Sequence, residues 1–281
     1  MASVERTDPA PSAPAVTGNV LSRLRQGGLA DLAVGLVVPV TLLLAWEVAG
    51  RAGWISTKLL PAPSTVLAAI ATLVESGELW THVWATLWRV LVGFGLGVAA
   101  GTAIGALTGY STLARRLLDP TIQALRNIPS IAWVPLFILW FGIFETSKVL
   151  LIAVGVFFPV YLNLASAIHD VDRKLVEVAR VYRYNGWQMV TRVLLPAALP
   201  TYVIGLRSGL GLGWMFVVAA EIMGASEGLG YLLVDGQMSG RTPVILGSIT
   251  LFAILGKMTD LALARATAPL AAWQDGFKGK G

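Results

Sequence analysis

Few side chains in this sequence could do chemistry, and most of them lie in or beside long apolar stretches. The chain has no cysteine and only two histidines, His82 and His169, so thiol chemistry is excluded and a histidine-built metal centre is not expected. Gly256-Lys257 fails as a phosphate-binding loop, because Met258 follows the lysine and Leu251 stands where the first glycine belongs. We therefore expect no enzyme activity, no metal and no cofactor in this chain.

Ionisable residues within the apolar stretches form a second group. A charge in hydrocarbon is costly, so such residues face protein or water. Lys257 and Asp260 lie three residues apart and are expected to pair on one helix face. Pairing inside a helix bundle is one interpretation of the group, and an ion-coupled secondary transporter is another. Its members are Glu47, Arg89, Arg126, Arg207, Glu221, Lys257 and Asp260.

The composition places the chain in a membrane. Hydrophobic residues make up 56% of the chain and charged residues 13%, whereas soluble domains carry roughly 25% charged residues. Pro129 and Pro135 interrupt one of the apolar stretches. We predict an all-α membrane protein with six transmembrane helices, at about residues 32–50, 83–110, 121–141, 148–168, 201–224 and 243–266.

Charge distribution predicts the orientation and the domain limits. The net charge is +5, and because the cations flank apolar stretches, the positive-inside rule explains them better than nucleic-acid binding does. We predict a disordered cytoplasmic tail at residues 1–29, a transmembrane domain at 30–270 and a cytoplasmic C-terminal tail at 271–281. The predicted outer loops hold only Arg51, Lys58, Lys148 and Arg241 as cations.

Glycine recurs at every fourth residue in the second and fifth predicted spans. Small residues at this interval let two helix backbones approach closely. Packing within one chain and a seam between two copies both fit the pattern. The glycines are Gly93, Gly97, Gly101, Gly105, Gly109, Gly205, Gly209 and Gly213.

A charged segment at residues 170–200, the elbow, joins the fourth and fifth spans. Its apolar residues recur at spacings of three and four, which predicts an amphipathic helix with Asp170 or Asp172 as N-cap. Asn185-Gly186 is predicted to stop this helix, and Pro196 and Pro200 to separate the elbow from the next span. The apolar residues are Leu175, Val178, Ala179 and Tyr182.

The elbow resembles the EAA loop of the membrane subunits of binding-protein-dependent ABC importers. That pattern is Glu-Ala-Ala, three residues, Gly, nine residues, Ile, one residue and Leu-Pro. Arg183 stands at the glycine position, where a positive φ would cost arginine about 1 kcal/mol, unless Asn185-Gly186 makes the turn instead. The matching residues are Glu177, Ala179, Leu195 and Pro196, with Val193 in place of isoleucine.

The resemblance extends over most of residues 32–266 and points to the nitrate/sulfonate/taurine permease branch, within it to the aliphatic sulfonate permeases. It implies a type I ABC importer permease fold. It also implies a homodimer with two cytoplasmic ATPases, which hold ATP and Mg, and a periplasmic or lipid-anchored binding protein. The shared motifs include Gly53-Trp54-Ile55-Ser56, Leu60-Pro61-Ala62-Pro63, Leu125-Arg126-Asn127-Ile128-Pro129 and Leu139-Trp140-Phe141-Gly142.

The same resemblance assigns roles to residues. A coupling helix in the elbow would dock on the ATPase, and the alternative for its basic charge is binding of anionic lipid headgroups. The solute would be an aliphatic sulfonate, or else taurine, nitrate, bicarbonate or another small anion. Candidate path residues are Arg126, Asn127, Arg207 and Glu221. The coupling residues would be Arg173, Glu177, Ala179, Tyr182, Arg183, Gly186, Val193, Leu195 and Pro196.

Overall fold

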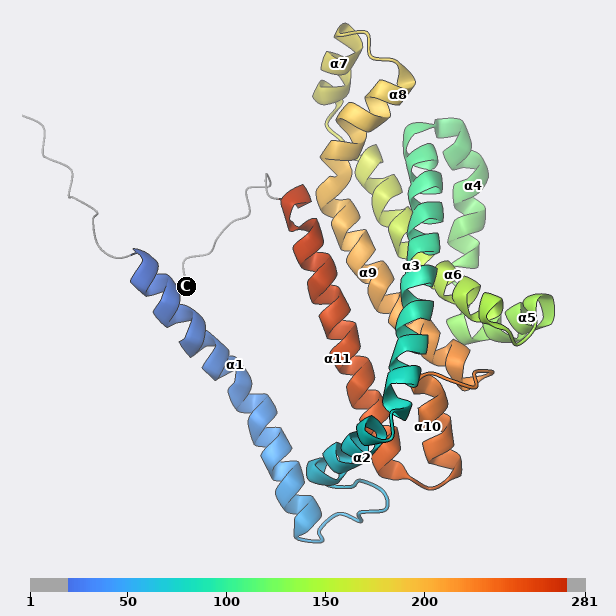
Figure 1. Ribbon diagram of the computed structural model, residues 1–281. Helices are drawn as coiled ribbons and strands as arrows, with labels where there is room; N and C mark the ends of the chain where they lie inside the picture. The colour runs from blue at the N-terminus through green and yellow to red at the C-terminus, as the bar shows by residue number, and fades with distance from the viewer. Residues whose placement is uncertain (1–19, 272–281) are drawn as a thin grey trace, which may run out of the picture. The chain divides into compact units, whose positions relative to one another are not determined.

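The structure is a computed structural model that describes residues 20–271, and this range is helical with no strand (Figure 1). The chain divides into two compact units, residues 1–55 and residues 56–281. Among the described residues, five helices are long and apolar enough to cross a membrane. The all-α class is thus confirmed, while one of the six predicted spans takes a different form.

The first unit contains a single helix, α1 (Val20–Arg51), whose span begins at Val34. Residues 20–29 are helical, so the prediction that the unstructured tail reaches residue 29 is wrong; residues 1–19 of that tail lie outside the described range. Apolar side chains such as Val37 and Leu43 are exposed, which suits a helix surrounded by hydrocarbon.

The second unit begins with a short helix that turns sharply into a long one. α2 (Pro63–Glu75) has Pro63 in its first turn, where a missing N–H costs nothing, and α3 (Glu78–Tyr110) follows after Gly77, whose φ is 79°. The second half of α2 packs in an apolar cluster with α10 (Leu229–Met238) and α11 (Thr242–Thr267).

The third predicted span is not one helix. α4 (Thr112–Leu125) and α5 (Ser130–Phe141) are separated by a turn at residues 126–129. Pro129 lacks the N–H that a continuous helix needs and disfavours the helical conformation of Ile128, so the chain turns before it. α4 lies beside α3 in Figure 1, and Ser111 caps its start by accepting the Ala114 N–H at 3.3 Å.

α6 (Glu145–His169) is the centre of the second unit. It is flanked by α3 and by α9 (Leu195–Ile222), and its core side chains Ile152, Val156 and Val160 have no exposed surface. α7 (Arg173–Val181), α8 (Gly186–Met189) and a π-helical turn, η1 (Val190–Leu194), connect α6 to α9.

The glycines of α3 lie against α6. A methyl group placed on Gly93 would lie 2.6 Å from Ile152, and one on Gly109 would lie 2.8 Å from Ile168. The contact advances along both helices in the same direction, so α3 and α6 run parallel.

The glycines of α9 lie on the other side of α6. Methyl groups on Gly205 and Gly213 would lie 2.8 Å from Asn163 and 3.2 Å from Val156. α9 therefore runs antiparallel to α6, and both glycine stripes pack within this chain.

We expect Gly97→Ala to destabilise the bundle, because the added methyl would lie 2.5 Å from the Ala153 carbonyl oxygen. Overpacking of this kind costs about 1–3 kcal/mol, which should lower the melting temperature of the detergent-solubilised protein. Gly95→Ala is the matched control, because nothing lies within 4 Å of its added methyl. Equal melting temperatures for the two variants would contradict this packing.

Candidate functional site

The first arm of the elbow is α7, which begins at a side-chain cap. The Asp172 carboxylate accepts the Lys174 N–H at 2.9 Å, so Asp172, not Asp170, is the N-cap. Ala179 is buried, whereas Glu177 and Arg180 are exposed. α7 therefore presents its charged residues outward and packs against the bundle through Ala179 and the partly buried Val176.

The turn that ends α7 lies at Arg183. This residue has φ 56°, and it is the only non-glycine residue with positive φ in the described range. The Arg183 N–H donates to the Arg180 carbonyl at 2.9 Å, and the Tyr184 N–H donates to the Ala179 carbonyl at 3.1 Å. This is a Schellman cap, which normally has glycine at this position. Of the two turn sites that the sequence left open, the structure has the first, at the residue where the importer motif has glycine.

Asn185 and Gly186 start a helix and do not stop one. The Asn185 side chain accepts the Gln188 N–H at 2.8 Å, and the Gln188 side chain accepts the Asn185 N–H at 3.0 Å. These reciprocal bonds form a capping box at the start of α8. A methyl on Gly186 would lie 3.0 Å from the Tyr110 hydroxyl, so Gly186 lets the elbow approach the end of α3.

The second arm of the elbow continues into α9 without a break. Pro196 has no N–H to donate, and the Leu195 N–H bonds to the Val190 carbonyl in a π-helical turn. Pro200 lies inside α9 and is buried. The prediction that the prolines separate the elbow from the span is wrong, since residues 186–222 form one continuous helical segment.

A small apolar cluster fixes the elbow to the bundle. Ala179, Met189 and Leu194 of the elbow pack with Leu164 and Ile168 of α6. The partly buried side chains of Val193 and Leu195 lie against the same cluster. These contacts position the elbow against the ends of the spans.

The two faces of α7 line two different pockets. On the charged face, a pocket of about 580 Å³ is lined by residues that include Arg173, Glu177 and Arg180. On the apolar face, a pocket of about 440 Å³ is lined by residues that include Leu175, Tyr182, Arg192, Val193 and Pro196. Within the part of the chain that the structure describes, Arg173, Glu177 and Arg180 form no ion pair. The elbow thus offers both unpaired charge and open apolar surface for contact with another molecule.

The four candidate path residues do not come together. Arg126 and Asn127 lie in the turn between α4 and α5, where the Asn127 amide donates to the Gln123 carbonyl at 2.9 Å. Arg207 lies near the middle of α9, and Glu221 lies at its end.

Arg207 pairs with Asp260, a partner that the sequence did not predict for it. Its Nε and Nη2 lie 2.8 and 2.9 Å from the two carboxylate oxygens of Asp260 on α11. Lys257 lies 3.9 Å from the same carboxylate, so the predicted Lys257–Asp260 pair is also present.

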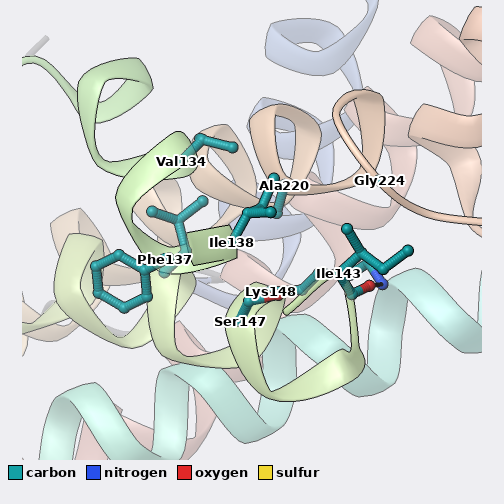
Figure 2. Close-up of a pocket in the computed structure, with 9 residues that line it drawn as sticks. Val134, Phe137, Ile138, Ile143, Ser147, Lys148, Ala220 and Gly224 are labelled. Atoms are coloured by element: carbon teal, nitrogen blue, oxygen red, sulfur yellow. Dashed lines mark hydrogen bonds between the residues drawn. The ribbon is translucent and has the colours of Figure 1, made fainter. Parts of the chain in front are cut away.

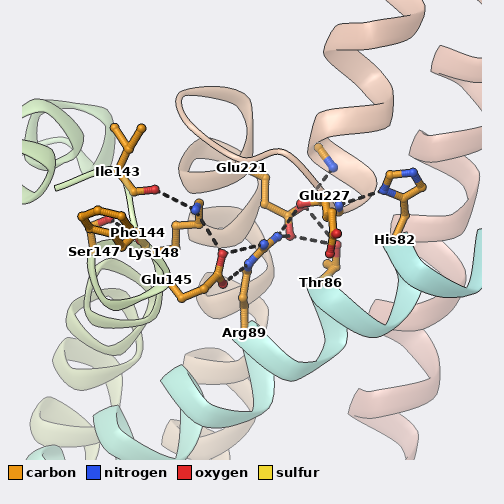
Figure 3. Close-up of polar contacts among 12 residues, drawn as sticks. His82, Thr86, Arg89, Ile143, Phe144, Glu145, Ser147, Lys148, Glu221 and Glu227 are labelled. Atoms are coloured by element: carbon orange, nitrogen blue, oxygen red, sulfur yellow. Dashed lines mark hydrogen bonds and ion pairs between the residues drawn. The ribbon is translucent and has the colours of Figure 1, made fainter. Parts of the chain in front are cut away.

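Glu221 belongs to a buried charge network with Arg89 (Figure 3). Arg89 Nη1 lies 2.7 Å from Glu221, while Nε and Nη2 lie 2.6 and 2.8 Å from Glu145. The Thr86 hydroxyl donates to Glu221 at 2.9 Å, and Lys148 approaches Glu145 at 3.1 Å. Two cations meet two carboxylates, so the charges balance inside the protein. Glu221 has no exposed side-chain surface, which differs from the path-lining position predicted for it.

The network also holds the loop between α9 and α10. Arg89 donates to the Glu227 carbonyl at 2.6 Å, His82 Nδ1 accepts the Gly228 N–H at 3.0 Å, and the Gly230 N–H donates to Glu221 at 2.8 Å. Gly228 has φ 124°, and a methyl there would lie 2.5 Å from the Glu221 carboxylate. Arg89 and Glu221 stood out in the sequence as charges in apolar stretches, but nothing there linked them to Glu145 or to this loop.

The crevice next to this network is too small for a solute (Figure 2). Its volume is about 10 Å³, and its lining includes Val134, Phe137, Ser147 and Ala220. Such a space holds one water molecule at most. Within residues 20–271, no group of three histidine or acidic side chains could hold a metal ion.

The five long apolar helices among the described residues, with a charged elbow between two of them, are the features of a multi-pass membrane protein. Residues 93–264 match the family described as binding-protein-dependent transport system inner membrane component. The chain belongs to this family and is a multi-pass membrane permease.

Relatives and a solved structure agree with this assignment. The chain is 42% identical to the Bacillus subtilis protein assigned as aliphatic sulfonates transport permease SsuC, over 87% of this chain and 89% of that protein. It is 34% identical to the taurine transport system permease protein TauC of Escherichia coli, over 83% and 86% of the two chains. A chain from inward-facing structures of the MetNI methionine ABC transporter has a TM-score of 0.60 at 23% identity, over 67% of this chain and 94% of that one, so the fold is shared.

We expect Arg183→Gly to stabilise the elbow, because glycine removes the cost of a side chain at positive φ, about 1 kcal/mol. Hydrogen exchange at the amides of residues 183 and 184 should slow roughly fivefold. Arg180→Gly removes the same charge from the helix itself and should speed exchange of the α7 amides. Faster exchange in Arg183→Gly would contradict the strained turn.

We expect Glu221→Ala to destabilise the protein by about 3–5 kcal/mol, because it removes the buried carboxylate that pairs with Arg89 Nη1 and accepts hydrogen bonds from the Thr86 hydroxyl and the Gly230 N–H. Denaturant unfolding in detergent micelles measures this loss. The double variant Arg89→Met/Glu221→Met removes both charges and should recover part of the stability, since Glu145 is half exposed and is then hydrated. A double variant less stable than Glu221→Ala would contradict the network's dependence on charge pairing.

Proposed function

We propose that this permease is the membrane subunit of an ATP-driven importer for aliphatic sulfonates. The observation that carries the proposal is 42–43% identity to two proteins assigned as aliphatic sulfonate permeases, each covered over more than four fifths of its length. Identity to the taurine permease is lower, at 34%. Taurine, nitrate, bicarbonate or another small anion is the alternative solute within the same class of importer.

α7 is the proposed coupling helix. Its exposed Arg173, Glu177 and Arg180 would meet charges on a cytoplasmic ATPase, and Leu175 and Tyr182 would seat against apolar surface. The continuous helix from Gly186 to Ile222 supports this role, because a movement of the elbow passes directly into a span.

The complete importer is proposed to contain two copies of this permease, two ATPases and a periplasmic or lipid-anchored binding protein. ATP and Mg would bind the ATPases, which agrees with the failed phosphate-loop match at Gly256-Lys257. Both termini are proposed to lie in the cytoplasm of a bacterial cell, because the cations concentrate on that side of the predicted spans. The solute path would run between the two permease copies.

We expect Glu177→Lys to abolish ATP-dependent sulfonate uptake, because a cation replaces the carboxylate in the middle of the docking face. The variant should still insert in the membrane but should retain less ATPase on affinity purification. Uptake into proteoliposomes that contain permease, ATPase and binding protein, measured with and without ATP, tests this.

Glu75→Lys is the control, with the same charge change at an exposed residue of α2 far along the chain from the elbow. It should leave uptake and ATPase binding unchanged. Normal uptake by Glu177→Lys would remove the coupling role. Uptake by the unmodified importer without ATP would favour an ion-coupled secondary transporter.

A further inference from the structure

A stripe of exposed residues on α9 carries a charge near the middle of a candidate membrane span. Ile204, Arg207, Ser208, Gly211 and Met215 are exposed and recur at helical spacing. At 1.5 Å per residue, Arg207 lies roughly 18 Å from the start of α9 and roughly 22 Å from its end. A charge at this depth faces protein or water and not lipid.

The charges beside this stripe do not balance. Arg207 is held by Asp260 through two hydrogen bonds, at 2.8 and 2.9 Å. Lys257 shares the same carboxylate at 3.9 Å, and its side chain is 75% exposed. Two cations and one carboxylate leave one positive charge in excess. The Arg89 network contrasts with this, because its charges balance and its arginine is buried.

The helices that carry these charges are joined close to them. The Trp214 indole N–H on α9 donates to the Thr259 hydroxyl on α11 at 2.9 Å. Arg207 and Asp260 are therefore held between two packed helices. Within the residues that the structure describes, the ion pair that Lys257 makes is with the same carboxylate, at 3.9 Å. A bidentate arginine is satisfied by its partner. The lysine ammonium keeps donors free for another anion.

We propose that this stripe lines an aqueous path and that Lys257 supplies the positive potential that draws a small monoanion, such as a sulfonate, into it. The Asp260 carboxylate, which Arg207 holds, positions the Lys257 ammonium beside the path. The inference rests on the proposed function, because it assumes that the importer has a solute path. It adds that Lys257 makes this path favour anions over cations.

The absence of cysteine from the sequence makes a direct test available. A methyl on Gly211 would meet nothing within 4 Å, so Gly211→Cys introduces a thiol one turn from Arg207 without a clash. Its reaction rates are measured in membranes with two water-soluble methanethiosulfonates, one with a sulfonatoethyl group and one with a trimethylammonioethyl group. Each rate is divided by the rate of the same reagent with free 2-mercaptoethanol.

We expect both reagents to react and the anionic reagent to be favoured after this correction. In the Gly211→Cys background, Lys257→Gln should lower the preference by about tenfold, because a single charge dominates the local field. Lys257→Arg should retain the preference. Arg265→Gln is the matched control, since it removes one exposed cation from the last turn of the same helix and should leave the preference unchanged.

Three results would overturn the proposal: no reaction of either reagent, a preference unchanged by Lys257→Gln, or an equal loss in Arg265→Gln. Ser208→Cys is the second reporter if Gly211→Cys does not insert. The labelling needs no transported solute, so its result does not depend on whether the importer takes up sulfonates. An importer that takes up no sulfonate but labels as expected would lose its assigned solute and keep an anion-favouring path.

Discussion

Close contact between helix backbones is the constraint on which the second unit depends. α6 is enclosed by glycines of α3 on one side and of α9 on the other, and even a methyl group at Gly93 or Gly97 would overlap α6 atoms. In a membrane, where lipid chains compete with apolar side chains, such close packing is a main source of helix association. It also determines the register of the helices, and so it sets which polar groups meet at each depth.

That register separates two kinds of charge. Near the loop between α9 and α10, the cations Arg89 and Lys148 meet the carboxylates of Glu145 and Glu221, so the formal charges balance. In the middle of α9, Arg207 shares one carboxylate with Lys257 and leaves a positive excess on an exposed face. The first arrangement stabilises the fold. The second is the one proposed to attract a small monoanion to the exposed face of α9.

Much of the fold follows from sequence pattern, because hydrophobic length and glycine spacing are local signals. The amphipathic α7 and the all-helical class are examples. Features that depend on tertiary contact were missed: the break between α4 and α5, and the pairing of Arg207 with Asp260 on another helix. The local pair of Lys257 with Asp260 was predicted, because the two residues lie three apart on one helix. The sequence did not decide whether the chain turns at Arg183 or at Asn185-Gly186. Arginine rarely adopts a positive φ, and here the hydrogen bonds of the turn stabilise that conformation. The π-helical turn before Pro196 was missed for a similar reason, since a proline usually signals a break.

The unbroken helix from Gly186 to Ile222 has a mechanical consequence. Its 37 residues follow about 55 Å of helix axis, with the elbow at one end and Glu221 near the other, and the axis bends where the π-helical turn joins α8 to α9 (Figure 1). When α9 moves as a rigid lever about its first residue, a tilt of about 10° displaces its far end, about 40 Å away, by roughly 7 Å. The same side chain that closes the charge network with Arg89 is therefore carried on the end of the lever that would move furthest.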